Sequence, residues 1–223
     1  MKTFAIIPAG GKGVRSGSAT PKQYLKFKGK ELIVYTLETF QKNRLVNKIV
    51  VSADPSYFNL LEKLKSKYHI TKLEQIVEGG KERQDSVHNG LLSIKAKKDD
   101  RVIVHDAARA LLPAEVLTNS IKMAKNKGNA LVCIKAGDTL LKGKSTVNYY
   151  IDRKDIYYVQ TPQIFKYADL MKAMEKAYSE GFYGTDESML VKRINKKIHI
   201  AEGSPLNFKI TSKSDMEFFR KLI

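Results

Sequence analysis

Short apolar runs alternate with amphipathic stretches along most of this chain, and the alternation predicts both strands and helices. Runs of five or six mostly apolar residues with β-branched side chains predict buried strands. These runs are Thr3–Pro8, Lys48–Ala53, Leu73–Val77, Arg101–His105 and Ala130–Ile134. Between them, apolar residues recur every three or four positions, as on one face of a helix. The helices predicted in this way are Glu31–Lys42, Pro55–Tyr68, Ser86–Lys95 and Pro113–Asn126.

The regular alternation stops after the fifth strand. Residues 137–158 contain turn residues and short alternating segments, which favour a β-arm that projects from the sheet. The pattern then resumes with helices predicted over Tyr167–Tyr178, Thr185–Ile194 and Ser212–Leu222. Two late strands are expected at Ile198–Ala201 and Asn207–Ile210.

Strands that alternate with helices predict an α/β fold, here a Rossmann-like, mostly parallel sheet with helices on both faces. We expect one domain over residues 1–223, with the arm at 137–158 inside it. Ligands of such sheets bind at the carboxyl ends of the strands. The residues that directly follow each strand are therefore the candidates for function.

The net charge of +17 raises the question of a nucleic-acid partner. Only 8 of the 40 basic residues are arginine, and the lysines are spread over the whole chain without a long cluster. Lysine is a hydrated point charge, whereas arginine is the usual reader of bases and phosphates. We therefore expect no specific nucleic acid, although a positive field would attract small phosphorylated substrates.

The remaining composition favours a cytoplasmic protein. The single cysteine, Cys133, excludes an internal disulfide and suits a reducing compartment. No apolar run approaches the ~20 residues of a membrane helix, so no membrane contact is expected. The first apolar run is also too short for the core of a signal peptide.

A glycine-rich loop follows the first strand and carries the clearest chemical signal. The segment from Pro8 to Leu25 reads PAGGKGVRSGSATPKQYL, with Arg15 and Lys22 among its glycines. Glycines let backbone N–H groups approach phosphate oxygens, and the two cations add to that attraction. The loop lacks the G-K-[ST] ending of a Walker A motif, and Ser16 stands where the dinucleotide motif needs its third glycine.

The same loop resembles the signature of the cytidylyltransferases that act on small polyol phosphates. Further segments resemble that family's motifs in the family's order: GGKERQDSVHNGL at 79–91, VHDAAR at 104–109, DT at 138–139, DR at 152–153, QTPQIF at 160–165, TDE at 185–187 and NFKIT at 207–211. The resemblance covers the whole chain and implies a nucleotidyltransferase fold. It also implies transfer of the cytidylyl group of CTP to 2-C-methyl-D-erythritol 4-phosphate, with Mg²⁺, as a step of isoprenoid synthesis.

The resemblance assigns roles to residues of this sequence. The implied catalytic cations are Arg15, Lys22, Arg153 and Lys209. The implied nucleotide-binding residues are Pro8, Ala9, Gly10, Gly11, Gly13, Gly80, Lys81, Ser86 and Asp106, of which Asp106 is also the candidate metal ligand. The implied substrate-binding residues are Arg109, Thr139, Thr161, Thr185 and Asp186. In this family the arm packs on a second subunit, so the resemblance implies a homodimer in which Arg153 completes the neighbouring site.

Several alternatives stay open at the level of sequence. Asp106 suits capping of the next segment as well as metal contact. Asp85 is expected to serve the start of a helix, and His105 is expected to be a structural hydrogen-bonding residue. The cations Arg153 and Lys209 suit an exposed surface as well as a phosphate site. The alternative acceptor is ribitol 5-phosphate or another polyol phosphate, although RQDSVHNG resembles the erythritol enzymes more than the ribitol ones.

Overall fold

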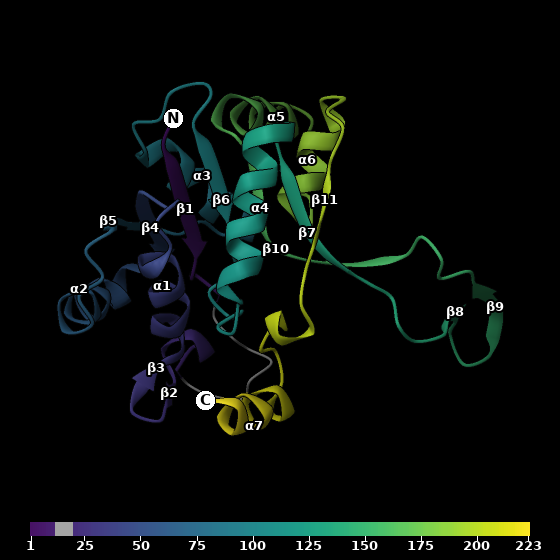
Figure 1. Cartoon of the computed structure of the whole chain (residues 1–223), viewed down its shortest axis with the longest axis horizontal. Coiled ribbons are helices and arrows are strands. Elements are labelled where there is room, and N and C mark those ends of the chain that lie inside the picture. The colour runs from purple at the N-terminus through teal and green to yellow at the C-terminus, as the bar shows by residue number, and fades with distance from the viewer. Residues whose placement is uncertain (12–19) are drawn as a thin grey trace.

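The structure is a computed structural model that describes residues 1–11 and 20–223. Its centre is a seven-stranded sheet in the order β11-β7-β10-β6-β1-β4-β5 (Figure 1). The strands are β1 (Thr3–Pro8), β4 (Lys48–Ala53), β5 (Leu73–Glu78), β6 (Arg101–Val104), β7 (Ala130–Lys135), β10 (Tyr157–Lys166) and β11 (Ile200–Glu202). All pairings are parallel except those of β10, which runs antiparallel to both β6 and β7. The predicted mostly parallel α/β sheet is therefore confirmed.

Helices cover both faces of this sheet because its buried strands are apolar on both sides. Along β1, Ala5 and Ile7 join one core cluster, whereas Phe4 and Ile6 join the other, as a period of two requires. The first cluster is covered by α1 (Leu32–Lys42), α2 (Phe58–Lys67) and α4 (Ala114–Lys127). The second is covered by α3 (Arg83–Ser93), α5 (Tyr167–Ser179) and α6 (Glu187–Arg193). Within the described residues, none of the helices combines the length and the apolar character needed to cross a bilayer.

Strand β10 is the main element that the sequence pattern did not predict. Its residues 160–165 are buried, yet three of them are the polar Gln160, Thr161 and Gln163, and Pro162 interrupts the run. Proline cannot donate to a sheet ladder, and the register of β10 against β7 shifts between Val159 and Gln163. Because of these polar side chains and the proline, hydrophobic periodicity did not predict this buried strand.

The strand predicted at Asn207–Ile210 is wrong. A single 3-10 turn spans Pro205–Asn207, and the chain after it has no strand partner. The buried side chain of Asn207 fixes this segment instead, because its Nδ2 donates to the carbonyl of Thr161 at 2.7 Å. The backbone N–H of Ile210 donates to the carbonyl of Ala108 at 2.9 Å. These two contacts bring the C-terminal segment to the carboxyl end of β6.

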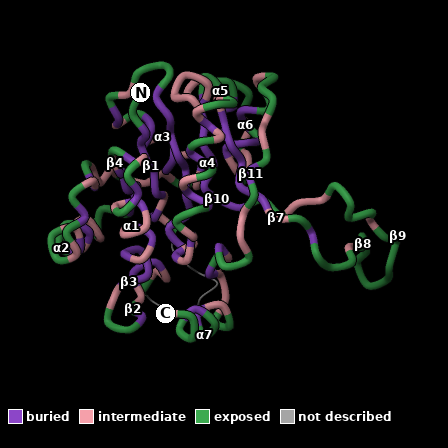
Figure 2. Tube along the Cα trace, in the orientation of Figure 1, coloured by how far each residue is buried: buried purple, intermediate pink, exposed green. Residues whose placement is uncertain are grey.

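The predicted arm is confirmed as a two-stranded hairpin of β8 (Leu140–Gly143) and β9 (Val147–Ile151). It extends far from the body of the molecule and is exposed over almost its whole length (Figure 2). A smaller hairpin of β2 (Lys26–Phe27) and β3 (Lys30–Glu31) packs with α7 (Lys213–Leu222) in a third cluster. Together the arm and the third cluster extend the fold beyond its central sheet.

Candidate active site

A pocket of about 410 Å³ opens at the carboxyl edge of the sheet. Its walls come from the segments that follow β1, β5 and β6, together with Lys22 and Gln23 and the C-terminal residues Lys209 and Thr211. The complete lining is Pro8, Ala9, Gly10, Gly11, Lys22, Gln23, Gly80, Lys81, Glu82, Arg83, Ser86, Asp106, Ala107, Ala108, Lys209 and Thr211. Ten of the residues implied by the sequence therefore meet in one pocket, as expected for the carboxyl ends of parallel strands.

The backbone after β1 is held open by a buried glutamine. The side-chain Nε2 of Gln23 donates to the carbonyl of Ala9 at 2.6 Å and to that of Gly11 at 3.0 Å. The N–H of Ala9 donates to the carbonyl of Ser52 at 2.7 Å, which ties the same segment to β4. The glycine-rich segment thus starts from a fixed position. Gln23 belongs to the PKQYL end of the glycine-rich segment, where the sequence predicted no role for it.

The second wall follows β5 and requires a glycine. The N–H of Gly80 donates to Oγ of Ser86 at 3.0 Å, so the turn closes on the first turn of α3. A Cβ at Gly80 would overlap the side chain of Asp85. Asp85 itself accepts from the N–H of Glu82 at 2.9 Å and from the hydroxyl of Tyr178 at 2.7 Å. The expected helix-start role of Asp85 is confirmed, and the helix begins at Arg83 rather than at Ser86.

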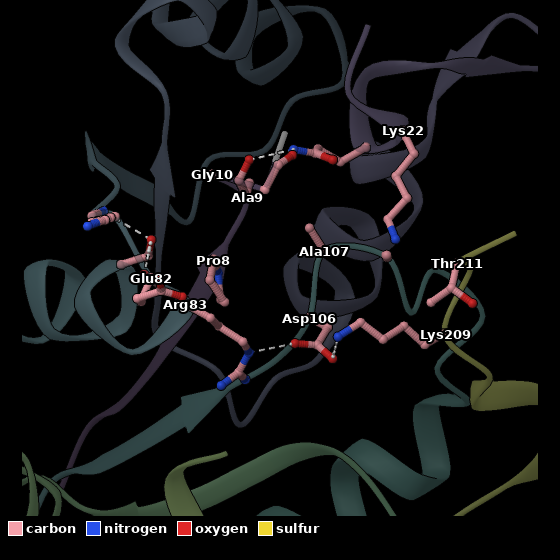
Figure 3. A pocket seen from close by; sticks show the side chains of 16 residues that line it. Pro8, Ala9, Gly10, Lys22, Glu82, Arg83, Asp106, Ala107, Lys209 and Thr211 are labelled. Atoms are coloured by element: carbon pink, nitrogen blue, oxygen red, sulfur yellow. Dashed lines mark hydrogen bonds and ion pairs between the residues drawn. The ribbon is translucent and has the colours of Figure 1, made fainter. Parts of the chain in front are cut away.

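Asp106 is the electrostatic centre of the pocket and pairs with three cations, of which Figure 3 shows Arg83 and Lys209. Its Oδ1 lies 3.1 Å from Nε of Arg83. Its Oδ2 lies 3.0 Å from Nζ of Lys209 and 3.5 Å from Nε of Arg109. Burial alone would raise the pKa of Asp106, but the charges of the three cations outweigh it and hold that pKa well below its usual range. The carboxylate is therefore ionised at neutral pH.

The strand-end histidine takes part in the structure rather than in proton transfer. His105 is fully buried, with Nδ1 at 3.0 Å from Oγ1 of Thr161 and Nε2 at 3.1 Å from the carbonyl of Arg109. Burial lowers the pKa of His105 to about 4, so the ring is neutral at pH 7. The hydroxyl of Thr161 also accepts from the N–H of Asp106 at 3.1 Å. Thr161 therefore fixes Asp106 from behind and is not part of the pocket lining.

Comparison with known proteins identifies the family of the chain. The family model for IspD, 2-C-methyl-D-erythritol 4-phosphate cytidylyltransferase, matches residues 3–221. The chain belongs to this family. The 2-C-methyl-D-erythritol 4-phosphate cytidylyltransferase of Geotalea uraniireducens is 38% identical over 97% of this chain and 94% of its own. The 2-C-methyl-D-erythritol 4-phosphate cytidylyltransferase of Clostridium acetobutylicum is 37% identical over 95% of this chain and 93% of its own.

Solved structures give the same assignment. The crystal structure of the Francisella tularensis cytidylyltransferase superposes with a TM-score of 0.85, at 30% identity and with complete coverage of both chains. The Thermus thermophilus cytidylyltransferase superposes with a TM-score of 0.83, at 26% identity, over 100% of this chain and 98% of the other. Membership of the IspD family makes this chain an enzyme, a nucleotidyltransferase of isoprenoid biosynthesis.

Other residues implied by the IspD resemblance lie outside the pocket. Arg109 is held behind Asp106, where its Nη1 donates to the carbonyl of Asn207 at 2.7 Å. Thr139 and Arg153 are exposed on the arm, and Arg153 donates to the carbonyl of Gly137. Asp186 caps α6 by accepting from the N–H of Met189 at 3.1 Å, beside the exposed Thr185. Gly13 and Arg15 lie outside the described residues.

Two charged residues near Asp106 received no role from the sequence. Arg83 lines the pocket, and the buried Glu187 at the start of α6 accepts from its Nη1 at 2.7 Å. Both residues lie within segments that resemble the family's motifs, GGKERQDSVHNGL and TDE, so the sequence indicated that these segments belong to the site. Their pairing was not predictable, because 104 positions separate them in sequence.

Proposed function

We propose that this IspD-family enzyme transfers the cytidylyl group of CTP to 2-C-methyl-D-erythritol 4-phosphate and binds the nucleotide in the pocket around Asp106. An oxygen of the polyol phosphate attacks the α-phosphorus, the bond between that phosphorus and the β-phosphate oxygen breaks, and pyrophosphate leaves. No general base is needed because the attacking phosphate is already deprotonated. The observation that carries the proposal is a pocket whose glycine turns and cations surround one ionised carboxylate.

The cations have separate roles in this proposal. Lys22 extends from the far side of the pocket toward Ala107 (Figure 3), and with Arg15 it would neutralise the triphosphate. Charge gathers on the oxygens of the transferring phosphoryl group, where a preorganised donor is worth about 2.7–4 kcal/mol. Lys209, whose side chain is 40% exposed, and Arg153 are assigned to the polyol phosphate.

The remaining candidate residues are assigned to the polyol and to the cytosine. Arg109, Thr139, Thr185 and Asp186 are proposed to bind the polar groups of the polyol. Thr161 would act only through the placement of Asp106, given its hydrogen bonds to that residue and to His105. Backbone groups around Gly80 and the side chain of Ser86 are proposed to contact the cytosine, since a backbone edge needs no particular side chain at Lys81.

A divalent cation such as Mg²⁺ fits the proposed site if it arrives with the nucleotide. The described residues contain no group of three or more His, Cys, Asp or Glu side chains that could hold a metal ion. Mg²⁺ commonly takes one or two protein carboxylates and completes its shell with phosphate oxygens and water. Asp106 supplies such a carboxylate. The metal would neutralise charge on the phosphates, while the chain's cations orient them.

The proposed enzyme is a cytoplasmic homodimer. A two-stranded hairpin is marginal alone in water, and the arm exposes Leu141, Val147, Tyr149 and Tyr150. Packing on a second copy would cover these side chains. In a closed symmetric dimer the contact is reciprocal, so each arm would carry its Arg153 toward the neighbouring site.

The test of the reaction is pyrophosphate release by the purified protein with CTP and a panel of polyol phosphates. We expect turnover with 2-C-methyl-D-erythritol 4-phosphate and at most weak turnover with ribitol 5-phosphate. ATP in place of CTP is the matched control for the base. Equal turnover of the two polyol phosphates, or of CTP and ATP, would contradict the proposal.

The shared site is tested by mixing two inactive variants, Lys22→Ala and Arg153→Ala, under conditions in which subunits exchange. A mixed dimer with shared sites contains one site with both changes and one with neither, so activity should return. Sedimentation measures the dimer, and co-purification of one untagged variant with the other, affinity-tagged variant measures the exchange. No recovery despite exchange, or a strictly monomeric protein, would refute the shared site and leave the reaction unaffected.

A further inference from the structure

Glu187 is a buried carboxylate to which the proposed reaction gives no role. It is the first residue of α6, and its side chain is only 1% exposed. Its Oε1 lies 2.7 Å from Nη1 of Arg83, while its Oε2 has no hydrogen-bond partner among the described residues. Burial raises the pKa of Glu187, although the charge of Arg83 opposes the rise. A buried carboxylate in this position costs solvation free energy, and the ion pair with Arg83 offsets that cost.

Arg83 joins Glu187 to the centre of the pocket. Its Nη1 donates to Glu187, and its Nε donates to Oδ1 of Asp106 at 3.1 Å. The planar guanidinium presents these donors in a rigid fork, so fixing one end fixes the direction of the other. Figure 3 shows the side chain of Arg83 reaching Asp106 from one side and Lys209 reaching it from the other. Asp106 thus receives its position from groups on both sides.

The start of α6 is anchored independently of this ion pair. The N–H of Ser188 donates to Oε1 of the buried Gln163 on β10 at 3.0 Å. Asp186 caps the helix through the N–H of Met189 at 3.1 Å. The start of α6 is therefore fixed without the ion pair, and Glu187 can hold Arg83 in one position.

We propose that Glu187 is a positioning residue, which holds the Arg83 guanidinium so that Asp106 faces the nucleotide in its working position. The inference rests on the proposed function, because it takes Asp106 to serve the nucleotide. It gives Glu187, the last residue of the TDE motif, a role on the nucleotide side of the site. Thr185 and Asp186 of the same motif are proposed to bind the polyol. It also predicts that Glu187 acts only through Arg83.

Glu187→Gln tests the positioning, since glutamine keeps the shape and one acceptor but loses the charge. We expect kcat to fall about ten- to hundredfold, as for a small misplacement of a reacting group, while the KM for CTP changes less than about threefold. The matched control is Glu180→Gln, which removes the ion pair to Arg193 at the opposite end of α6. The control should keep the parental kcat.

A double-mutant cycle separates positioning from a merely structural contribution. Arg83→Met leaves Glu187 buried without its partner, so this variant should melt below the double variant Arg83→Met/Glu187→Gln. The double variant should have the kcat of Arg83→Met to within about twofold, because Glu187 has nothing left to hold. The comparison remains informative if Glu187→Gln alone folds poorly.

Parental kcat in Glu187→Gln, or kcat losses that add in the double variant, would overturn the positioning role. A double variant that melts below Arg83→Met would overturn the pairing itself. Failure of the parent protein to release pyrophosphate from CTP with any polyol phosphate is a different result. That outcome would refute the proposed function, whereas the melting temperatures would still report the coupling between Glu187 and Arg83.

Discussion

Asp106→Asn is the most informative single change, because it removes one charge from the centre of three cations without changing the shape of the side chain. In the parent protein the carboxylate lies within 3.5 Å of cationic nitrogens of Arg83, Lys209 and Arg109. Removing one partner of a buried ion pair costs about 3–5 kcal/mol. Lys209 is 40% exposed and Arg83 retains Glu187, so the expected loss of unfolding free energy is smaller, about 2–3 kcal/mol.

Urea denaturation at pH 7 measures this loss, and its pH dependence checks the cause. The pKa of Asp106 in the folded protein lies below its ordinary value of 3.8, so the unfolded chain binds the proton first as the pH falls. The stabilisation is therefore complete above about pH 4 and is lost as the pH falls further. Asparagine does not titrate, so parent and variant should converge in stability in acid.

An anion supplies the second check. Pyrophosphate without divalent metal should raise the melting temperature of Asp106→Asn more than that of the parent, because it can replace the missing negative charge. Asp99→Asn is the matched control, since Asp99 forms an exposed ion pair with Lys166 at 3.0 Å. Parental stability of Asp106→Asn at pH 7, or a smaller effect of pyrophosphate on the variant, would refute the assigned electrostatics.

Three further changes test other parts of the site. Lys22→Ala should lower kcat at least about a hundredfold, the effect of losing about 3 kcal/mol of transition-state stabilisation, whereas Lys42→Ala on α1 should not change it. Gly80→Ala should raise the KM for CTP about tenfold, because its Cβ would overlap Asp85 and displace the turn. Gly137→Ala is the control and should leave this KM unchanged, since the space around its Cβ is open. Burial raises the pKa of the Cys133 thiol to about 11, so a thiol reagent at pH 8 should modify this cysteine only after the protein unfolds in urea. Rapid modification of the native protein would contradict the burial.

The elements that the sequence predicted well are those whose signal is local. The strand from Thr3 to Pro8 and the helix ending at Lys42 follow from apolar periodicity within a few residues. Strand β10 escaped because its buried positions include Gln160, Thr161 and Gln163, whose partners lie far away in the chain. A strand stabilised by buried polar contacts has no apolar run to reveal it.

The site shows the same division. The glycine at 80 was predictable, because a turn that leaves no room for a Cβ favours glycine, whereas a Cβ at Gly10 would meet only ordinary contacts. The grouping of Arg83, Asp106 and Glu187 was not predictable, because two strand–helix connections and the connection from α5 to α6 must fold before their side chains meet. Sequence reasoning gave a metal-binding or capping role to Asp106. It gave no sign that three cations would surround that carboxylate.

The charge count around Asp106 indicates what the pocket can accept. Arg83, Arg109 and Lys209 contribute three positive charges, and Asp106 and Glu187 contribute two negative ones, so this cluster keeps a net positive charge before Lys22 is added. A bare divalent cation would be repelled by that excess, whereas a triphosphate that carries its own metal would be attracted. The local charge balance around one carboxylate therefore favours a phosphorylated ligand, without any contribution from the +17 of the whole chain.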